Sequence, residues 1–284
     1  EKLRCKVEDI VNCKYLNDMI VRVIRYLEKL LEKEEDGRIK FLKKLPEVIS
    51  MFDKQTLVHK VIPPLIMQLR DDRLVHHVLP SLIKITEELE PADYQQLIEP
   101  TLAKYFVSID LPQVFYTLID NVILLCSKST IESRRDNLIP MALKGLAVRN
   151  VAIQTNVLKN IPVLVEKQYI EWRDLKNKLL PKLKEICNIS VPANANCKVA
   201  PLRVNVLMCL AKIFHKFDTD TIKQIILKEC VWTVLSRSKE TAILMSVLGV
   251  CDAVAKHVSP HVVANDILPH LVPLLLQESL NAKQ

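Results

Sequence analysis

Residues 61–69 read VIPPLIMQL, an apolar segment with the composition of a buried helix that nevertheless contains Pro63 and Pro64. Proline inside a helix removes a backbone donor and clashes with the preceding turn, at a cost of about 3 kcal/mol. Similar segments recur along the chain: VLPSLIKI at 78–85, LIPMALKGL at 138–146, LLPKLKEI at 179–186 and ILPHLVPLL at 267–275. This recurrence indicates that proline marks a fixed position in a repeating unit.

The prolines share one register. It comprises Pro63, Pro100, Pro140, Pro181 and Pro269, with Lys228 where one further proline would fall. Apolar residues recur at three- and four-residue spacing almost throughout, which is typical of amphipathic helices. A period of about 40 residues with two helices per unit is typical of HEAT and armadillo arrays. The sequence therefore predicts an all-α fold, a HEAT/armadillo-type α-solenoid of about six antiparallel helical hairpins.

The periodic segments give the expected elements. We expect one solenoid domain over 1–284, with a single helix at 18–34, repeats over 38–276 and an inter-repeat loop at 187–201. The expected hairpins are 38–51/54–70, 73–89/92–107, 112–127/130–146, 150–166/171–187, 202–217/219–235 and 239–257/260–276. Within them, Leu207 and Leu248 are expected to face the core.

The composition excludes several functional classes. Three glycines among 284 residues are too few for phosphate-binding loops, dinucleotide-binding folds or many tight hairpins. The eight cysteines contain no C-x-x-C pair, and most lie among Leu and Val, so we expect buried thiols rather than metal ligands. No catalytic, cofactor-binding or metal-binding residues are expected. No apolar run is long enough to span a membrane, and the chain is expected to be a fragment of a larger protein.

Basic residues are concentrated in one part of the chain. Residues 141–216 contain 13 Lys and Arg against 4 Asp and Glu, whereas the remainder has 27 against 29. Two interpretations stay open: a solvated lysine face, or a docking site for an acidic peptide, an anionic lipid headgroup or, least favoured, nucleic acid. The residues that would carry such a site are Lys176, Lys178, Lys182, Lys184, Lys198 and Arg203.

Aromatic residues offer a second kind of candidate, since tryptophan often anchors a binding partner. Trp172 lies in the polar segment YIEWRDLK and is predicted to be a surface anchor. Trp232 lies in the apolar segment ECVWTVL, where packing in the core is the favoured interpretation.

Three segments carry a family resemblance: RYLEKLLEKEEDGRIKFLKKLPEVISMFDKQTLVHKVIPPLI at 25–66, HHVLPSLIKITEEL at 76–89 and LIEPTLAKYF at 97–106. They resemble the HEAT region of the SCY-like pseudokinases, in particular the member associated with clathrin-coated vesicles. The resemblance implies a cytoplasmic scaffold, peripheral to Golgi, endosomal or coated-vesicle membranes, that binds trafficking adaptors or clathrin machinery. It supplies no catalytic residue, because the inactive kinase domain of that family would precede these residues.

The expected function is therefore non-catalytic protein–protein scaffolding in membrane traffic, beside a pseudokinase domain of the full protein. A nuclear-transport or nucleic-acid-associated HEAT adaptor is the alternative among binding proteins. An enzyme is the alternative from another class, and no converging polar residues in the sequence favour it.

Overall fold

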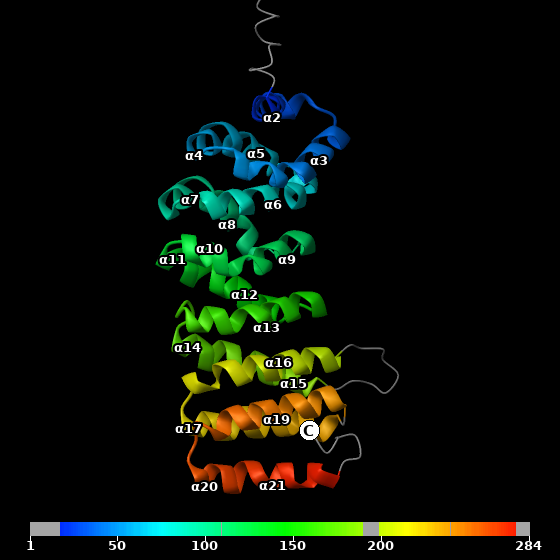
Figure 1. The fold of residues 1–284 in the computed structure, drawn as a ribbon, viewed down its shortest axis with the longest axis vertical. Helices are drawn as coiled ribbons and strands as arrows, with labels where there is room; N and C mark the ends of the chain where they lie inside the picture. The colour runs from blue at the N-terminus through cyan, green and yellow to red at the C-terminus, as the bar shows by residue number, and fades with distance from the viewer. Residues whose placement is uncertain (1–17, 109, 190–198, 239, 277–284) are drawn as a thin grey trace, which may run out of the picture. The chain divides into compact units, whose positions relative to one another are not determined.

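The computed structural model describes residues 18–108, 110–189, 199–238 and 240–276. Every regular element in these ranges is helical; α labels an α-helix and η labels a 3₁₀- or π-helical segment. The packing divides the chain into two compact units, Glu1–Ser133 and Arg134–Gln284. Within each unit, successive helical hairpins lie one on the next (Figure 1). The predicted all-α solenoid is confirmed, whereas one continuous domain over 1–284 stays a prediction.

In the first unit, the helices follow the predicted hairpins closely. Their bounds are α2 Met19–Glu28, η1 Leu30–Glu32, α3 Glu35–Lys44, η2 Leu45–Glu47, η3 Ile49–Met51, α4 Lys54–Thr56, η4 Leu57–Val61, α5 Ile62–Gln68, α6 Asp72–Glu88, α7 Pro91–Leu97, α8 Glu99–Val107, α9 Pro112–Asp120, α10 Val122–Lys128 and α11 Ile131–Ser133. The first helices of successive hairpins pack together, α3 on α6 and α6 on α9.

The second unit repeats this plan. Its elements are η5 Arg134–Leu138, α12 Ile139–Gly145, α13 Val151–Glu166, α14 Trp172–Asp174, η6 Leu175–Leu179, α15 Leu180–Asn188, α16 Val199–Ile213, η7 Phe214–Lys216, α17 Thr219–Thr221, η8 Ile222–Val231, α18 Trp232–Arg237, α19 Thr241–Ala255, α20 Pro260–Val262, η9 Val263–Ile267, α21 Leu268–Leu271 and η10 Val272–Leu276. The expected loop at 187–201 was too long at both ends, because α15 continues to Asn188 and α16 begins at Val199.

The repeated proline has a structural explanation. A π-helical segment precedes four of the five register prolines: η4 before Pro63, η5 before Pro140, η6 before Pro181 and η9 before Pro269. The Ile62 N–H bonds to the Leu57 carbonyl, five residues back, and the Leu180 N–H bonds to the Leu175 carbonyl in the same way. Because proline cannot donate to the fourth residue before it, the helix widens there to i→i−5 bonding and then resumes. The prediction that these prolines lie partway along the second helices is confirmed.

At Pro100 the second helix is interrupted before the proline instead of widening to a π-helix. The helix is interrupted at Ile98, between α7 and α8, and Pro100 occupies the first turn of α8. In the first helices, Pro80 and Pro162 lie inside α6 and α13, while Pro46 falls in the 3₁₀ turn η2 after α3.

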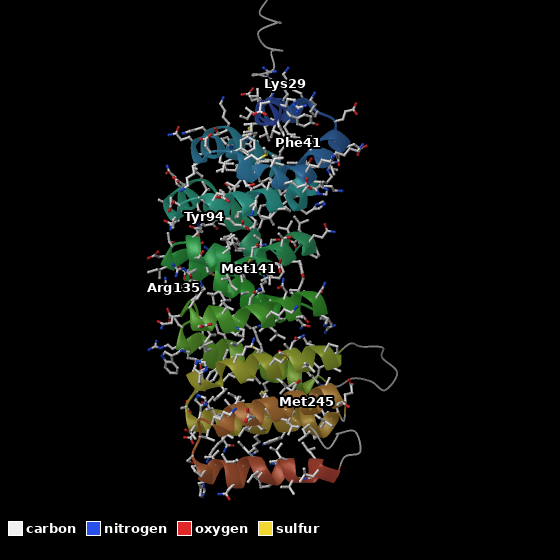
Figure 2. The ribbon with its side chains drawn as sticks, in the orientation of Figure 1. Lys29, Phe41, Tyr94, Arg135, Met141 and Met245 are labelled. Carbon is white, nitrogen blue, oxygen red and sulfur yellow. The ribbon has the colours of Figure 1, made fainter. Side chains whose placement is uncertain are left out.

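The core of each unit lies between the helix layers. Figure 2 shows side chains filling the space between successive helices, and of its labelled residues Tyr94 and Met141 are buried whereas Met245 is exposed. Leu207 is buried as predicted, but Leu248 is only half-buried, because Leu244 and Val247 take the inward positions of α19. The cysteines within the described ranges, Cys126, Cys187, Cys209, Cys230 and Cys251, are all buried, as expected. Cys5, Cys13 and Cys197 lie outside those ranges.

Candidate interaction surfaces

The predicted lysine face comprises Lys176, Lys178, Lys182 and Lys184, on η6 and α15. Three of these ammonium groups already face a carboxylate: Lys176 pairs with Asp218 at 3.2 Å, Lys178 with Asp174 at 2.8 Å and Lys184 with Glu229 at 2.8 Å. Among the described residues no carboxylate pairs with Lys182. The lysine face therefore carries much less uncompensated positive charge than its sequence indicates.

Two of these ion pairs belong to a ladder between neighbouring hairpins. Lys176 and Lys184 reach from η6 and α15 to Asp218 and Glu229 on the next second helix, and Lys223 reaches from that helix to Asp266 at 3.4 Å. Each pair is partly exposed to solvent, and such pairs contribute about 0–1 kcal/mol. The ladder therefore sets the alignment of neighbouring hairpins more than it stabilises them.

The remaining members of the predicted basic site are not on this face. Arg203 is buried in α16, and its guanidinium donates to the Ile189 carbonyl at 2.6 Å. Arg237 donates to the neighbouring Asn188 carbonyl, so two guanidinium groups satisfy the carboxyl end of α15. Burial, and then the charge of Arg237, lower the pKa of Arg203. Its assignment to an external anion site is therefore wrong, and Lys198 lies outside the described residues.

Trp172 is on the surface, where the sequence predicted it, with 65% of its area exposed. It lines a depression of about 490 Å³ between the end of α13, the start of α14 and Lys216. The other lining residues are Val165, Gln168, Ile170, Glu171, Arg173 and Leu175. Whether Trp172 anchors a partner there stays a prediction. Trp232 is half-buried rather than fully packed in the core, and its ring stacks on that of His270 at 4.4 Å between centroids.

One residue that lines this depression, Gln168, has a strained backbone. Gln168 has φ of 57°, within the left-handed region that favours glycine. The Gln168 N–H bonds to the Val165 carbonyl and the Tyr169 N–H to the Leu164 carbonyl, which is the Schellman pattern that ends a helix. The turn after α13, with Trp172 four residues on, is therefore held in one geometry by backbone bonds.

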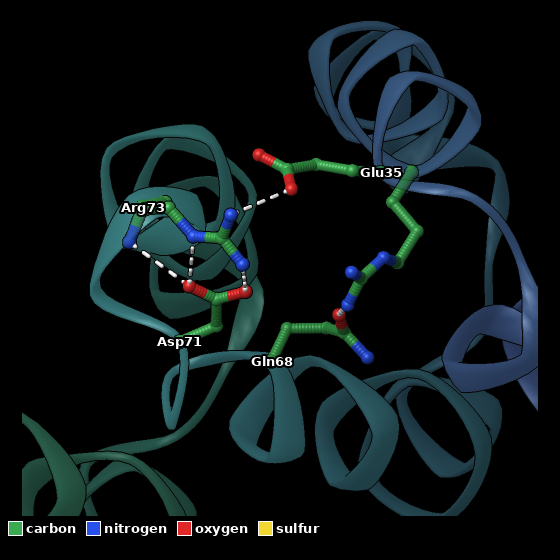
Figure 3. A network of polar contacts seen from close by, with 5 residues as sticks. Glu35, Gln68, Asp71 and Arg73 are labelled. Carbon is green, nitrogen blue, oxygen red and sulfur yellow. Dashed lines mark hydrogen bonds and ion pairs between the residues drawn. The ribbon is translucent and has the colours of Figure 1, made fainter.

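A second depression, in the first unit, was not anticipated. It measures about 240 Å³ and is lined by Leu31, Arg38, Met67, Gln68, Arg70 and Asp71, which we call the Arg38–Gln68 pocket. Arg38 Nη1 donates to Gln68 Oε1 at 3.2 Å. Figure 3 shows the network beside it, in which Arg73 contacts both Asp71 and Glu35, the latter at 2.8 Å. The hydrogen bond from Arg73, with a smaller contribution from the charge of Arg38, lowers the pKa of Asp71.

One sequence signal pointed to this pocket. Gln68 is the last but one residue of the segment VIPPLIMQL, and it follows Val61 and Leu65 at helical spacing, on the face that is buried. A glutamine on an apolar face needs partners for its amide, so its position predicts a buried polar contact. The identity of Arg38 as that contact could not be predicted, because the two residues lie on different helices of their hairpin, thirty residues apart in the chain.

Among the residues that the structure covers, no group of three His, Cys, Asp or Glu side chains is placed to hold a metal ion. The same residues include no helix that is both long and apolar enough to cross a membrane.

Known proteins with similar sequences were found for nearly the whole chain. The chain is 26% identical over 286 aligned residues to SCY1-like protein 2 of Homo sapiens, and equally to that of Mus musculus, across 99% of this chain. The resemblance to the SCY-like family is confirmed. The chain corresponds to 30% of the length of these SCY1-like relatives. No family model matches the chain.

A solved structure supports the fold. The crystal structure of Cex1p superposes with a TM-score of 0.72 over 95% of this chain and 52% of its own, at 17% sequence identity. At that level of identity the likeness concerns the fold, and it agrees with the helical-repeat architecture built up from the prolines.

Proposed function

We propose that this chain is a non-catalytic protein-interaction scaffold in clathrin and endosomal membrane traffic, and that the full protein carries a kinase-like domain beside it. The observation that carries the proposal is the match to SCY1-like protein 2 over nearly the whole chain. The helical-repeat fold supports the scaffold part, since arrays of this kind bind partners over extended surfaces. Cytoplasmic localisation at coated-vesicle membranes is part of the same proposal.

The mechanism is geometric. The hairpins hold their turns at fixed positions, and small depressions near those turns, such as those at Trp172 and Arg38, each accept a short part of a partner. Several weak contacts on one chain combine into useful affinity, because the later contacts form at high effective concentration.

We also propose that the lysine face binds an anionic partner, but only weakly. Lys182 has no carboxylate partner among the described residues. Lys176, Lys178 and Lys184 would have to break their present ion pairs before they could bind an anionic partner. Binding to acidic peptides or anionic lipids should therefore be weak and sensitive to salt.

Sedimentation with purified clathrin-coated vesicles tests the trafficking role. The purified 284-residue chain should pellet with vesicles and remain soluble with protein-free liposomes of the same lipid composition. A variant with Trp172→Ala tests whether that side chain anchors the vesicle protein. Equal pelleting with both membranes, or none with vesicles, would contradict the proposal, and turnover of a small-molecule substrate would contradict its non-catalytic part.

A further inference from the structure

The Arg38–Gln68 pocket contains hydrogen-bond donors that no residue in the described part of the chain satisfies. Gln68 is 1% exposed, yet its Nε2 has no hydrogen-bond partner among the described residues, and the same holds for the buried Nε of Arg38. Buried polar atoms without a partner are uncommon in folded proteins, so these two call for an explanation. Both residues line the pocket, and their one mutual bond uses the Gln68 oxygen and Arg38 Nη1, which leaves the Nε2 and Nε donors unused.

The charges around the pocket favour an anion. Arg70 forms no ion pair within the described residues and lies in the turn at the pocket wall. Asp71 is the acidic residue of the wall, but Arg73 holds its carboxylate at 3.1 Å and 3.0 Å. The pocket and the network beside it thus hold three guanidinium groups, of Arg38, Arg70 and Arg73, and two carboxylates, of Asp71 and Glu35, which leaves one positive charge in excess.

The shape and the rim favour a carboxylate on a peptide over a phosphate. Arg38 Nε and Gln68 Nε2 are two unused N–H donors, and a carboxylate has two oxygens that can accept from such donors. Leu31 and Met67 line the same pocket and are 58% and 43% exposed, so they offer apolar contacts beside the donors. The volume of about 240 Å³ suits one short side chain and part of its neighbour.

We propose that the Arg38–Gln68 pocket recognises an acidic peptide segment of a partner protein: an Asp or Glu carboxylate accepts hydrogen bonds from Gln68 Nε2 and Arg38 Nε, and an adjacent apolar side chain rests on Leu31 and Met67. This inference deepens the scaffold function by giving one surface a class of partner. It does not depend on the trafficking role, because its test uses only the purified chain and synthetic peptides.

The test uses two peptides and nuclear magnetic resonance. Acetyl-Leu-Asp-Leu-amide is titrated into the ¹⁵N-labelled 284-residue chain while the Arg38 Nε–H and Gln68 side-chain amide signals are followed. Acetyl-Leu-Asn-Leu-amide is the neutral control of almost equal shape. The acidic peptide should shift both signals in a saturable way, with a dissociation constant at least about tenfold lower than that of the neutral peptide.

Variants then separate recognition from structure. Gln68→Glu keeps the side-chain volume and an acceptor for Arg38 but adds a negative charge, so affinity for the acidic peptide should fall at least about tenfold. Gln154→Leu and Arg149→Met are the controls: Gln154 is a buried glutamine whose Nε2 already donates to the Leu146 carbonyl, and Arg149 is an exposed arginine of the other unit. Both should bind as the unmodified chain does.

Three results would overturn the inference: equal affinity for the two peptides, no shift of either signal at millimolar peptide, or full binding by Gln68→Glu. Phosphatidylserine vesicles provide a further arm. If vesicles shift the two signals and the acidic peptide does not, the pocket recognises a lipid headgroup and the peptide assignment is wrong. The two-peptide comparison on the unmodified chain decides the matter even if Gln68→Glu does not fold.

Discussion

The lysine face and the Arg38–Gln68 pocket differ in a way that reverses their appearance in the sequence. The lysine face lies in the part of the chain that carries the basic excess, but neighbouring carboxylates already pair with Lys176, Lys178 and Lys184. The pocket shows no charge excess in the sequence, yet Gln68 and Arg38 keep buried donors without acceptors. The difference teaches that availability for a partner depends on which groups the fold has already paired, and not on how many there are.

The largest expected effect concerns what supports the lysine face. Leu179 lies beneath it in η6 and is fully buried. We expect Leu179→Ala to lower the free energy of unfolding by about 2–5 kcal/mol, because it removes buried methyl groups and leaves a cavity. Denaturant unfolding measures this change. A loss near that of a surface substitution would mean that the ion-pair ladder, rather than the core, holds these helices.

Two buried glutamines allow a matched comparison. Gln154 donates to the Leu146 carbonyl at 2.8 Å. Gln154→Leu leaves this buried carbonyl without that donor and should lower the free energy of unfolding by about 1–3 kcal/mol. Gln68→Leu removes an amide nitrogen that has no partner among the described residues, and the half-buried Arg38 can turn its freed N–H to water, so it should cost less. Thermal unfolding of both variants compares them. An equal loss would indicate that the Gln68 amide is satisfied in solution, which would weaken the pocket's role.

A smaller effect is expected from a single rung of the ladder. In a double-mutant cycle of Lys184→Met and Glu229→Gln, we expect a coupling free energy of about 0.2–1 kcal/mol that declines with added salt. Lys182→Met serves as the control and should leave stability unchanged. If Lys184 and Glu229 show no coupling at low salt, the lysine face is less neutralised than the structure indicates, and the docking interpretation gains support.

The smallest effect is the pH response of one ladder residue. The hydrogen bonds from the Thr221 backbone and hydroxyl, followed by that from Lys176, lower the pKa of Asp218 from 3.8 to about 2. Because the folded pKa lies below the unfolded value, the stabilisation is present above pH 4 and is lost as the pH falls towards 2. A carboxyl titration followed by nuclear magnetic resonance measures this pKa. In the Lys176→Met variant it should rise only slightly, since Thr221 is the main cause.

Much of the fold could be predicted from the sequence because each hairpin depends on local patterns. The apolar spacing located the helices, and the proline register located the second helix of each hairpin. The aspartates of D-x-x-T at Asp53 and Asp218 accept from the backbone N–H of Thr56 and Thr221, and each begins a second helix at the next residue. Each of these features depends on residues only a few positions apart, so it can be recognised in the amino-acid sequence.

The tertiary structure decided the rest, because it depends on residues that meet across hairpins. Ile222–Val231 is π-helical over ten residues although Lys228 replaces the proline, so a missing donor is not the only cause of the widened helix. Lys176 and Lys184 proved to be paired, and Arg203 to be buried, through partners that lie a hairpin or a helix away. Gln68 and Arg38, thirty residues apart, meet at the pocket only once the two helices of their hairpin pack together. Sequence alone determined the repeating helices, whereas stacking determined which of their polar groups remain open to a partner.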